Sequence, residues 1–102
     1  MAKDLIQKTE RDYGKMYISY NIKTNEFEIT GNLNKIGQET ILEEFLRSQI
    51  GAGVDKSEPN IRDIYNITLI WHPDFDNIKV FSDTGNKGLR DAILYNVLNK
   101  LN

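Results

Sequence analysis

Apolar and polar residues alternate with a period of two over two pairs of short segments. The first pair is residues 16–22 and 26–30, around a polar turn at Lys23–Glu26. The second pair is residues 66–71 and 78–81, around a turn that contains Pro73. Successive side chains of a strand point to opposite faces, so this period is typical of half-buried strands. The pattern predicts two β-hairpins.

Each predicted hairpin is followed by a loop rich in glycine and asparagine and then by apolar residues at helical spacing. The first stripe, in residues 38–50, consists of Ile41, Leu42, Phe45, Leu46 and Ile50. The second consists of Leu89, Ala92, Ile93, Val97 and Leu101, and is widened by Leu94 and Leu98. Both stripes predict amphipathic helices. The two extra leucines extend the second stripe beyond one core face, so we expect this helix to be a possible surface for self-association.

The two halves of the chain share the order strand, turn, strand, loop, helix. A shift of 51 residues matches their character without a gap, placing Met16 on Ile67 and Gly37 on Gly88. Few matched residues are identical, and periodicity alone would align any two ββα units. Both a duplication and a chance agreement therefore stay open, and we expect a tandem ββα–ββα pseudo-repeat.

The length of 102 residues predicts one domain. We divide it into an N-terminal arm or short helix (1–15), a first ββα half (16–50), a connector (51–63) and a second ββα half (64–102). An isolated hairpin is only marginally stable, so the halves must combine. We expect an α+β fold: a four-stranded antiparallel sheet with two main helices on one face. The helix-facing layer would be Met16, Ile18, Tyr20, Ile22, Phe27, Ile29, Ile67, Leu69, Trp71, Ile78 and Val80.

The other face of the predicted sheet is mostly polar but includes Tyr17, Ile70 and Phe81. With the turns drawn above, Ile70 would lie directly across from Phe81, and Ser19 across from Thr30. This patch is a candidate surface for a homodimer or another protein partner. Alternatively, Leu5 and Ile6 of the arm pack across it, or scattered exposed apolar residues need no explanation.

Composition excludes several classes of function. A net charge of −2 argues against nucleic-acid binding, which usually relies on a basic face. The absence of cysteine excludes disulfides, thiolate zinc sites and a cysteine nucleophile. No apolar run has the length of a signal peptide core or a membrane span. We expect a cytoplasmic protein without membrane partners, and the abundance of asparagine and isoleucine suggests a bacterial or phage source.

Two groups of residues could carry chemistry. His72, Asp74 and Asp76 alternate in the second hairpin turn and could bind a divalent metal or move protons. Proline and aspartate are also favoured in turns for backbone reasons alone, and a turn tip is convex. Asn34 with Lys35, and Asn86 with Lys87, precede the helices and could hold an anion at the helix N-termini. The same asparagines would also serve as ordinary helix caps.

The sequence thus favours a small soluble accessory or interaction protein without enzymatic activity or a cofactor, which self-associates. A small anion- or ligand-binding protein that uses the strand-to-helix loops is the alternative. A metal-dependent enzyme at residues 72–76 is the third possibility.

Overall fold

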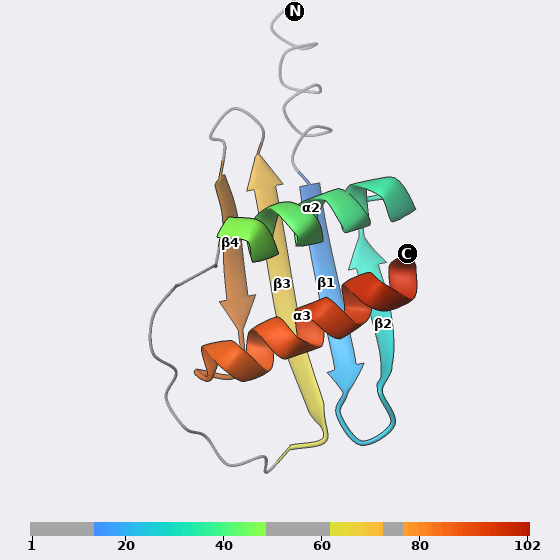
Figure 1. Cartoon of the computed structure of the whole chain (residues 1–102), viewed down its shortest axis with the longest axis vertical. Coiled ribbons are helices and arrows are strands. Elements are labelled where there is room, and N and C mark those ends of the chain that lie inside the picture. Colours follow the sequence, from blue (N-terminus) through green and yellow to red (C-terminus); the bar gives the residue numbers. More distant parts are fainter. Residues whose placement is uncertain (1–13, 49–61, 73–76) are drawn as a thin grey trace, which may run out of the picture.

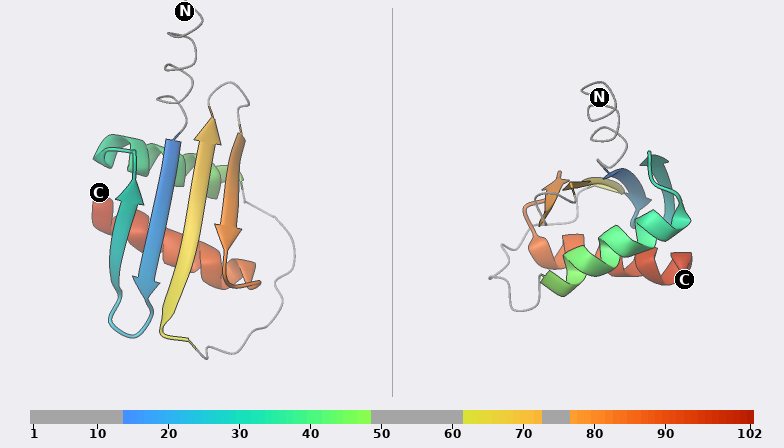
Figure 2. Two further views of the ribbon diagram at one scale, coloured as in Figure 1. Left: turned by 180° about the vertical axis from the view of Figure 1, so that it is seen from behind. Right: turned by 90° about the horizontal axis from the view of Figure 1, so that it is seen from above.

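The computed structural model describes residues 14–48, 62–72 and 77–102, which form two layers (Figure 1). One layer is a four-stranded antiparallel sheet and the other is a pair of helices, which confirms the predicted α+β class. The elements along the chain are β1 (Gly14–Asn21), β2 (Glu26–Gly31), α2 (Lys35–Ser48), β3 (Ile64–His72), β4 (Asn77–Ser82) and α3 (Lys87–Leu101). Both helices lie on the same side of the sheet (Figure 2).

The sheet has the strand order β2-β1-β3-β4, so the two hairpins meet through β1 and β3. In that central pair Tyr17 lies opposite Thr68, and Met16 lies opposite Leu69. β1 begins at Gly14, inside the segment expected to be an arm, and the arm's residues 1–13 lie outside the described residues. Most of the expected connector, residues 51–61, lies outside them as well.

The side chains that alternate toward the helices form the core. All members of the predicted helix-facing layer are either buried or packed against the buried cluster. Tyr65 was missed, although it is completely buried. β3 begins at Ile64, two residues before the predicted strand, because Ile64 and Tyr65 continue the pairing with Asn21 and Tyr20 on β1. Arg62 covers the outside of the buried ring, with its guanidinium carbon 5.0 Å from the Tyr65 centroid.

The predicted cross-strand partners within both hairpins were wrong by two residues. The observed pairs are Tyr17 with Thr30, Ser19 with Glu28, Thr68 with Phe81, and Ile70 with Lys79. Because a register shift of two residues leaves every side chain on its predicted face, the predicted core is still correct.

The closure of the first turn explains this shift. The loop comprises residues 22–25 rather than 23–26, because Asn21 pairs with Glu26. The Asn21 side chain accepts hydrogen bonds from the backbone N–H groups of Lys23 (2.9 Å) and Thr24 (3.2 Å). Asn25 takes a left-handed φ of 60°, which asparagine tolerates better than most residues. The turn therefore depends on the side-chain hydrogen bonds of Asn21 and the left-handed conformation of Asn25, which the alternation of apolar residues does not indicate.

Both helices turn pairs of apolar residues toward the sheet. In α2 the buried residues are Ile41, Leu42, Phe45 and Leu46, as predicted, while Ile50 lies outside the described residues. In α3 they include Ile93, Leu94, Val97 and Leu98, whereas Ala92 is exposed. Leu94 and Leu98 are thus core residues, and the expectation that they extend α3 beyond the core was wrong. α3 packs against α2 as well as the sheet, so its buried face is wider than that of a helix with one neighbour.

The two hairpins have the same register at an offset of 51 residues. Met16 pairs with Gly31, and Ile67 pairs with Ser82. The helices instead match at an offset of 52, since Asn34 and Asn86 both stand directly before a helix and the buried Ile41 corresponds to the buried Ile93. The gap-free match of Gly37 with Gly88 was therefore wrong: the loop before α3 contains one residue more than the loop before α2.

Candidate interaction surface

The face of the sheet opposite the helices carries the candidate surface, here called the outer face (Figure 2). Alternation along the strands places Tyr17 on β1, Ile70 on β3 and Phe81 on β4 on this face, together with the lysines Lys15 and Lys79. Tyr17 is 42% exposed and Phe81 is 57% exposed, while Ile70 is half-buried. The described helices leave this face uncovered.

The predicted surface residues lie in adjacent positions on the outer face. Tyr17 and Phe81 each pair with Thr68, so these three residues form one row across the strands. Ile70 occupies the next row on β3, diagonal to both aromatic residues. Diagonal neighbours on one face are about 7–8 Å apart, within reach of aromatic side chains. The structure thus brings all three predicted residues together, although not as the direct Ile70–Phe81 pair.

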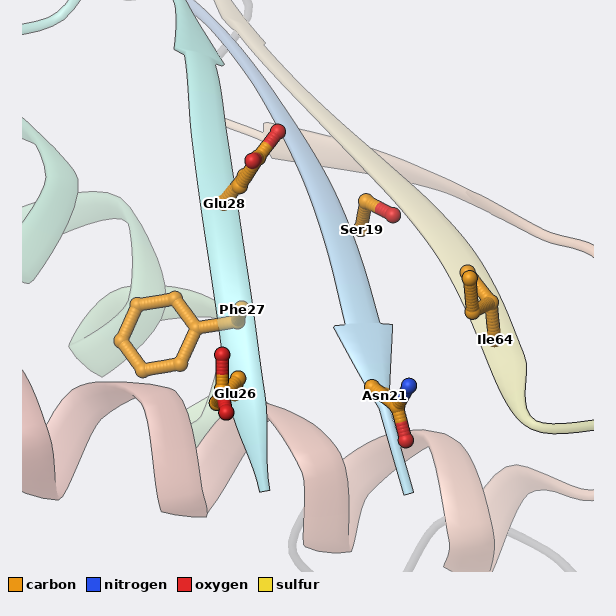
Figure 3. Close-up of a pocket in the computed structure, with 6 residues that line it drawn as sticks. All are labelled: Ser19, Asn21, Glu26, Phe27, Glu28 and Ile64. Carbon is orange, nitrogen blue, oxygen red and sulfur yellow. The ribbon is translucent and has the colours of Figure 1, made fainter. Parts of the chain in front are cut away.

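A hollow of about 400 Å³ opens beside this row, toward the first hairpin (Figure 3). The side chains of Ser19, Asn21, Glu26, Glu28 and Ile64 surround it, while the Phe27 ring points away on the other side of β2. Sequence reasoning missed this hollow because it placed Ile64 outside the third strand. The alternation of Glu26 and Glu28 indicates only that both face outward, whereas the hollow itself depends on the pairing of β1 with β3.

Opposite charges occupy opposite corners of the outer face. Glu26 and Glu28 lie on the edge strand β2, and Lys79 lies on the other edge strand β4. Both Glu28 and Lys79 are exposed. Within the part of the chain that the structure describes, neither forms an ion pair.

The residues considered for anion binding stand at the two helix starts. The Asn34 side chain accepts from the Gly37 N–H at 2.8 Å, and the Asn86 side chain accepts from the Leu89 N–H at 3.0 Å. Both asparagines thus cap helices. Lys35 and Lys87 are the exposed first residues of α2 and α3. The structure does not bring the two groups together, because α2 begins beside β2 and α3 begins beside β4 (Figure 1).

The side-chain carboxylate of Asp83 holds the loop before α3 in place. Asp83 accepts hydrogen bonds from the backbone N–H of Asn66 (3.1 Å) and lies 3.5 Å from the Arg62 guanidinium. Its own N–H donates to the Asn66 carbonyl at 3.2 Å, which extends the contact between the β3 and β4 segments past Ser82. Asp83 therefore fixes where the chain leaves the sheet for α3.

Of the three residues considered for metal binding, only His72 lies within the described residues. His72 is the last residue of β3, while Asp74 and Asp76 lie outside the described residues. Across residues 14–48, 62–72 and 77–102, no three histidine, aspartate or glutamate side chains are grouped so that they could hold a metal ion. None of the described helices is long and apolar enough to cross a membrane.

The outer face is thus the feature that unites the largest number of predicted surface residues. Comparison with known proteins adds no assignment to it: no protein-family model, curated protein or solved structure matches this chain.

Proposed function

We propose that this chain is a non-enzymatic interaction protein that self-associates through the outer face of its sheet. The observation that carries the proposal is the exposed pair Tyr17 and Phe81, which flank Thr68 in one row with Ile70 beside them. The uncovered face of an antiparallel sheet is usually polar, so adjacent apolar side chains depart from the expected pattern. Tyrosine and phenylalanine are also among the residues enriched in protein interfaces.

The size of the outer face indicates a reversible association. Four strands about 4.8 Å apart, with six to nine residues rising about 3.3 Å each, give a flat outline of about 400–500 Å². Stable interfaces bury about 800 Å² per partner, so this face alone falls short of that class. We therefore expect a dimer that forms with increasing protein concentration and dissociates on dilution.

We also propose that the fold is a tandem ββα pseudo-repeat. The common hairpin register at an offset of 51 residues and the equivalent caps Asn34 and Asn86 support it. The repeat axis would pass between Tyr17 and Thr68, which are partners in the central strand pair and differ by 51 in number. The two halves would then offer the same backbone geometry but different chemistry, since Glu28 and Lys79 occupy equivalent positions.

Light scattering coupled to size-exclusion chromatography tests the self-association over a series of loading concentrations. The expected result is a mass that rises toward that of a dimer for the wild type and stays monomeric for Phe81→Lys. The matched control is Tyr95→Lys, which places the same charge at a residue of α3 that is 48% exposed. We expect this control to associate like the wild type. A wild-type mass that stays monomeric at every concentration, or equal dissociation of both variants, would overturn the proposal.

A further inference from the structure

Building on the proposed self-association, we infer that the two copies cross at about a right angle, with Glu28 of each copy paired to Lys79 of the other. A second copy of this chain would then occupy the outer face. Two corners of that face carry complementary charges at positions fixed by the strand registers, and the hollow lies beside one of them.

The strand registers define the positions of the two charges. Glu28 pairs with Ser19 on β1, while Lys79 pairs with Ile70 on β3, which in turn pairs with Lys15 on β1. Glu28 and Lys79 are thus separated by three strand spacings and four residues along the strands. At about 4.8 Å per strand and about 3.3 Å per residue, these separations are about 14 Å and about 13 Å. The two charges therefore occupy opposite corners of a near-square centred between Tyr17 and Thr68.

This placement selects one symmetric arrangement. A two-fold axis that lies in the plane of the face, perpendicular to the Glu28–Lys79 diagonal, superimposes each charge on its opposite in the second copy. Because the diagonal runs at about 45° to the strands, the strands of the two copies cross at about 90°. Orthogonal packing is one of the two preferred ways in which sheets stack. A two-fold axis along or across the strands, which gives aligned sheets, would not bring Glu28 and Lys79 together.

The same rotation places an aromatic side chain of the second copy at the hollow. It brings Phe81 of the second copy over the pair of Ser19 and Asn66, at the edge of the hollow that Ile64 and Glu26 also surround (Figure 3). The most exposed aromatic side chain of the outer face would thus meet the hollow next to the apolar side chain of Ile64, while Lys79 would meet Glu28 at the rim. Each contact occurs twice, so the arrangement closes as a dimer.

A charge-exchange experiment tests this arrangement. Glu28→Lys and Lys79→Glu are prepared as separate full-length proteins, and their association is measured by sedimentation equilibrium, alone and mixed in equal amounts. Alone, each variant would place like charges at both contacts, and we expect about a tenfold weaker association than for the wild type. In the mixture both contacts become complementary, so a heterodimer should form with an affinity within about threefold of the wild type. Circular dichroism confirms that each variant is folded before mixing.

A third variant and the wild type make the outcomes separable. Glu43→Lys carries the same reversal on an exposed position of α2 and should associate like the wild type. A wild type that dimerises while the mixture shows no gain over the single variants would overturn the crossed arrangement and leave the proposed self-association standing. A wild type that remains monomeric would overturn both.

Discussion

At the scale of single residues, Gly31 is a position that the backbone restricts to glycine. It ends β2 with a φ of 128°, a conformation that residues with a side chain rarely adopt. A Cβ atom at this position would collide with the Lys15 carbonyl oxygen, which belongs to the backbone of the neighbouring strand. The glycine therefore lets the chain leave the sheet toward α2 without displacing β1.

Replacement of this glycine provides a direct test. We expect Gly31→Ala to lower the free energy of unfolding by about 2 kcal/mol or more, because both the backbone conformation and the close approach become unfavourable. Urea denaturation of a dilute, monomeric sample measures the change. Gly88→Ala is the control at an exposed position near the start of α3, where alanine should be neutral or slightly stabilising. Equal stability of Gly31→Ala and the wild type would contradict this account of the turn.

Individual polar residues also explain which details the sequence did not predict. The first hairpin register depends on the side-chain hydrogen bonds of Asn21 and the left-handed Asn25, and neither feature alters the apolar alternation. The burial of Tyr65 was missed because the predicted strand began at Asn66, one residue after it. Such local side-chain and backbone effects set the ends of elements, whereas the alternation sets only their faces.

At the scale of elements, the buried faces of the strands and of α2 could be predicted from the sequence, and that of α3 in part. Period-two and helical spacing identify the side of each element that must be buried, and every predicted helix-facing strand residue packs in or against the core. The breadth of the α3 stripe was misjudged, because a single sequence does not show that α3 has both α2 and the sheet as neighbours. The strand order, and with it the hollow and the charged corners, depends on contacts between distant segments.

The corrected role of α3 leads to a stability prediction. Leu94 is fully buried, and Leu→Ala changes at such positions cost about 2–5 kcal/mol. We expect Leu94→Ala to lower the free energy of unfolding by about 3 kcal/mol, again measured in urea. Asn99→Ala, at an exposed position of the same helix, should change it by less than about 0.5 kcal/mol. A small effect of Leu94→Ala on stability, together with a loss of association, would instead restore α3 as the self-association surface.

At the scale of the whole molecule, the two-layer architecture determines where association can occur. Both helices are used to cover one face of the sheet, so the opposite face presents its side chains without a described element above it (Figure 2). That face combines the aromatic row of Tyr17 and Phe81 with acidic and basic corners and a hollow. In the proposed dimer, a second copy would match all three features at once.

A dilution series followed by amide and side-chain NMR shifts of the full chain tests association through the outer face. We predict concentration-dependent shifts that cluster on the outer face, at Tyr17, Thr68, Phe81 and the Glu28 and Lys79 corners. Exposed helix residues such as Tyr95 should keep constant shifts and serve as the internal control. Shifts that stay constant everywhere over the whole series, or that cluster on α2 and α3, would contradict association through this face.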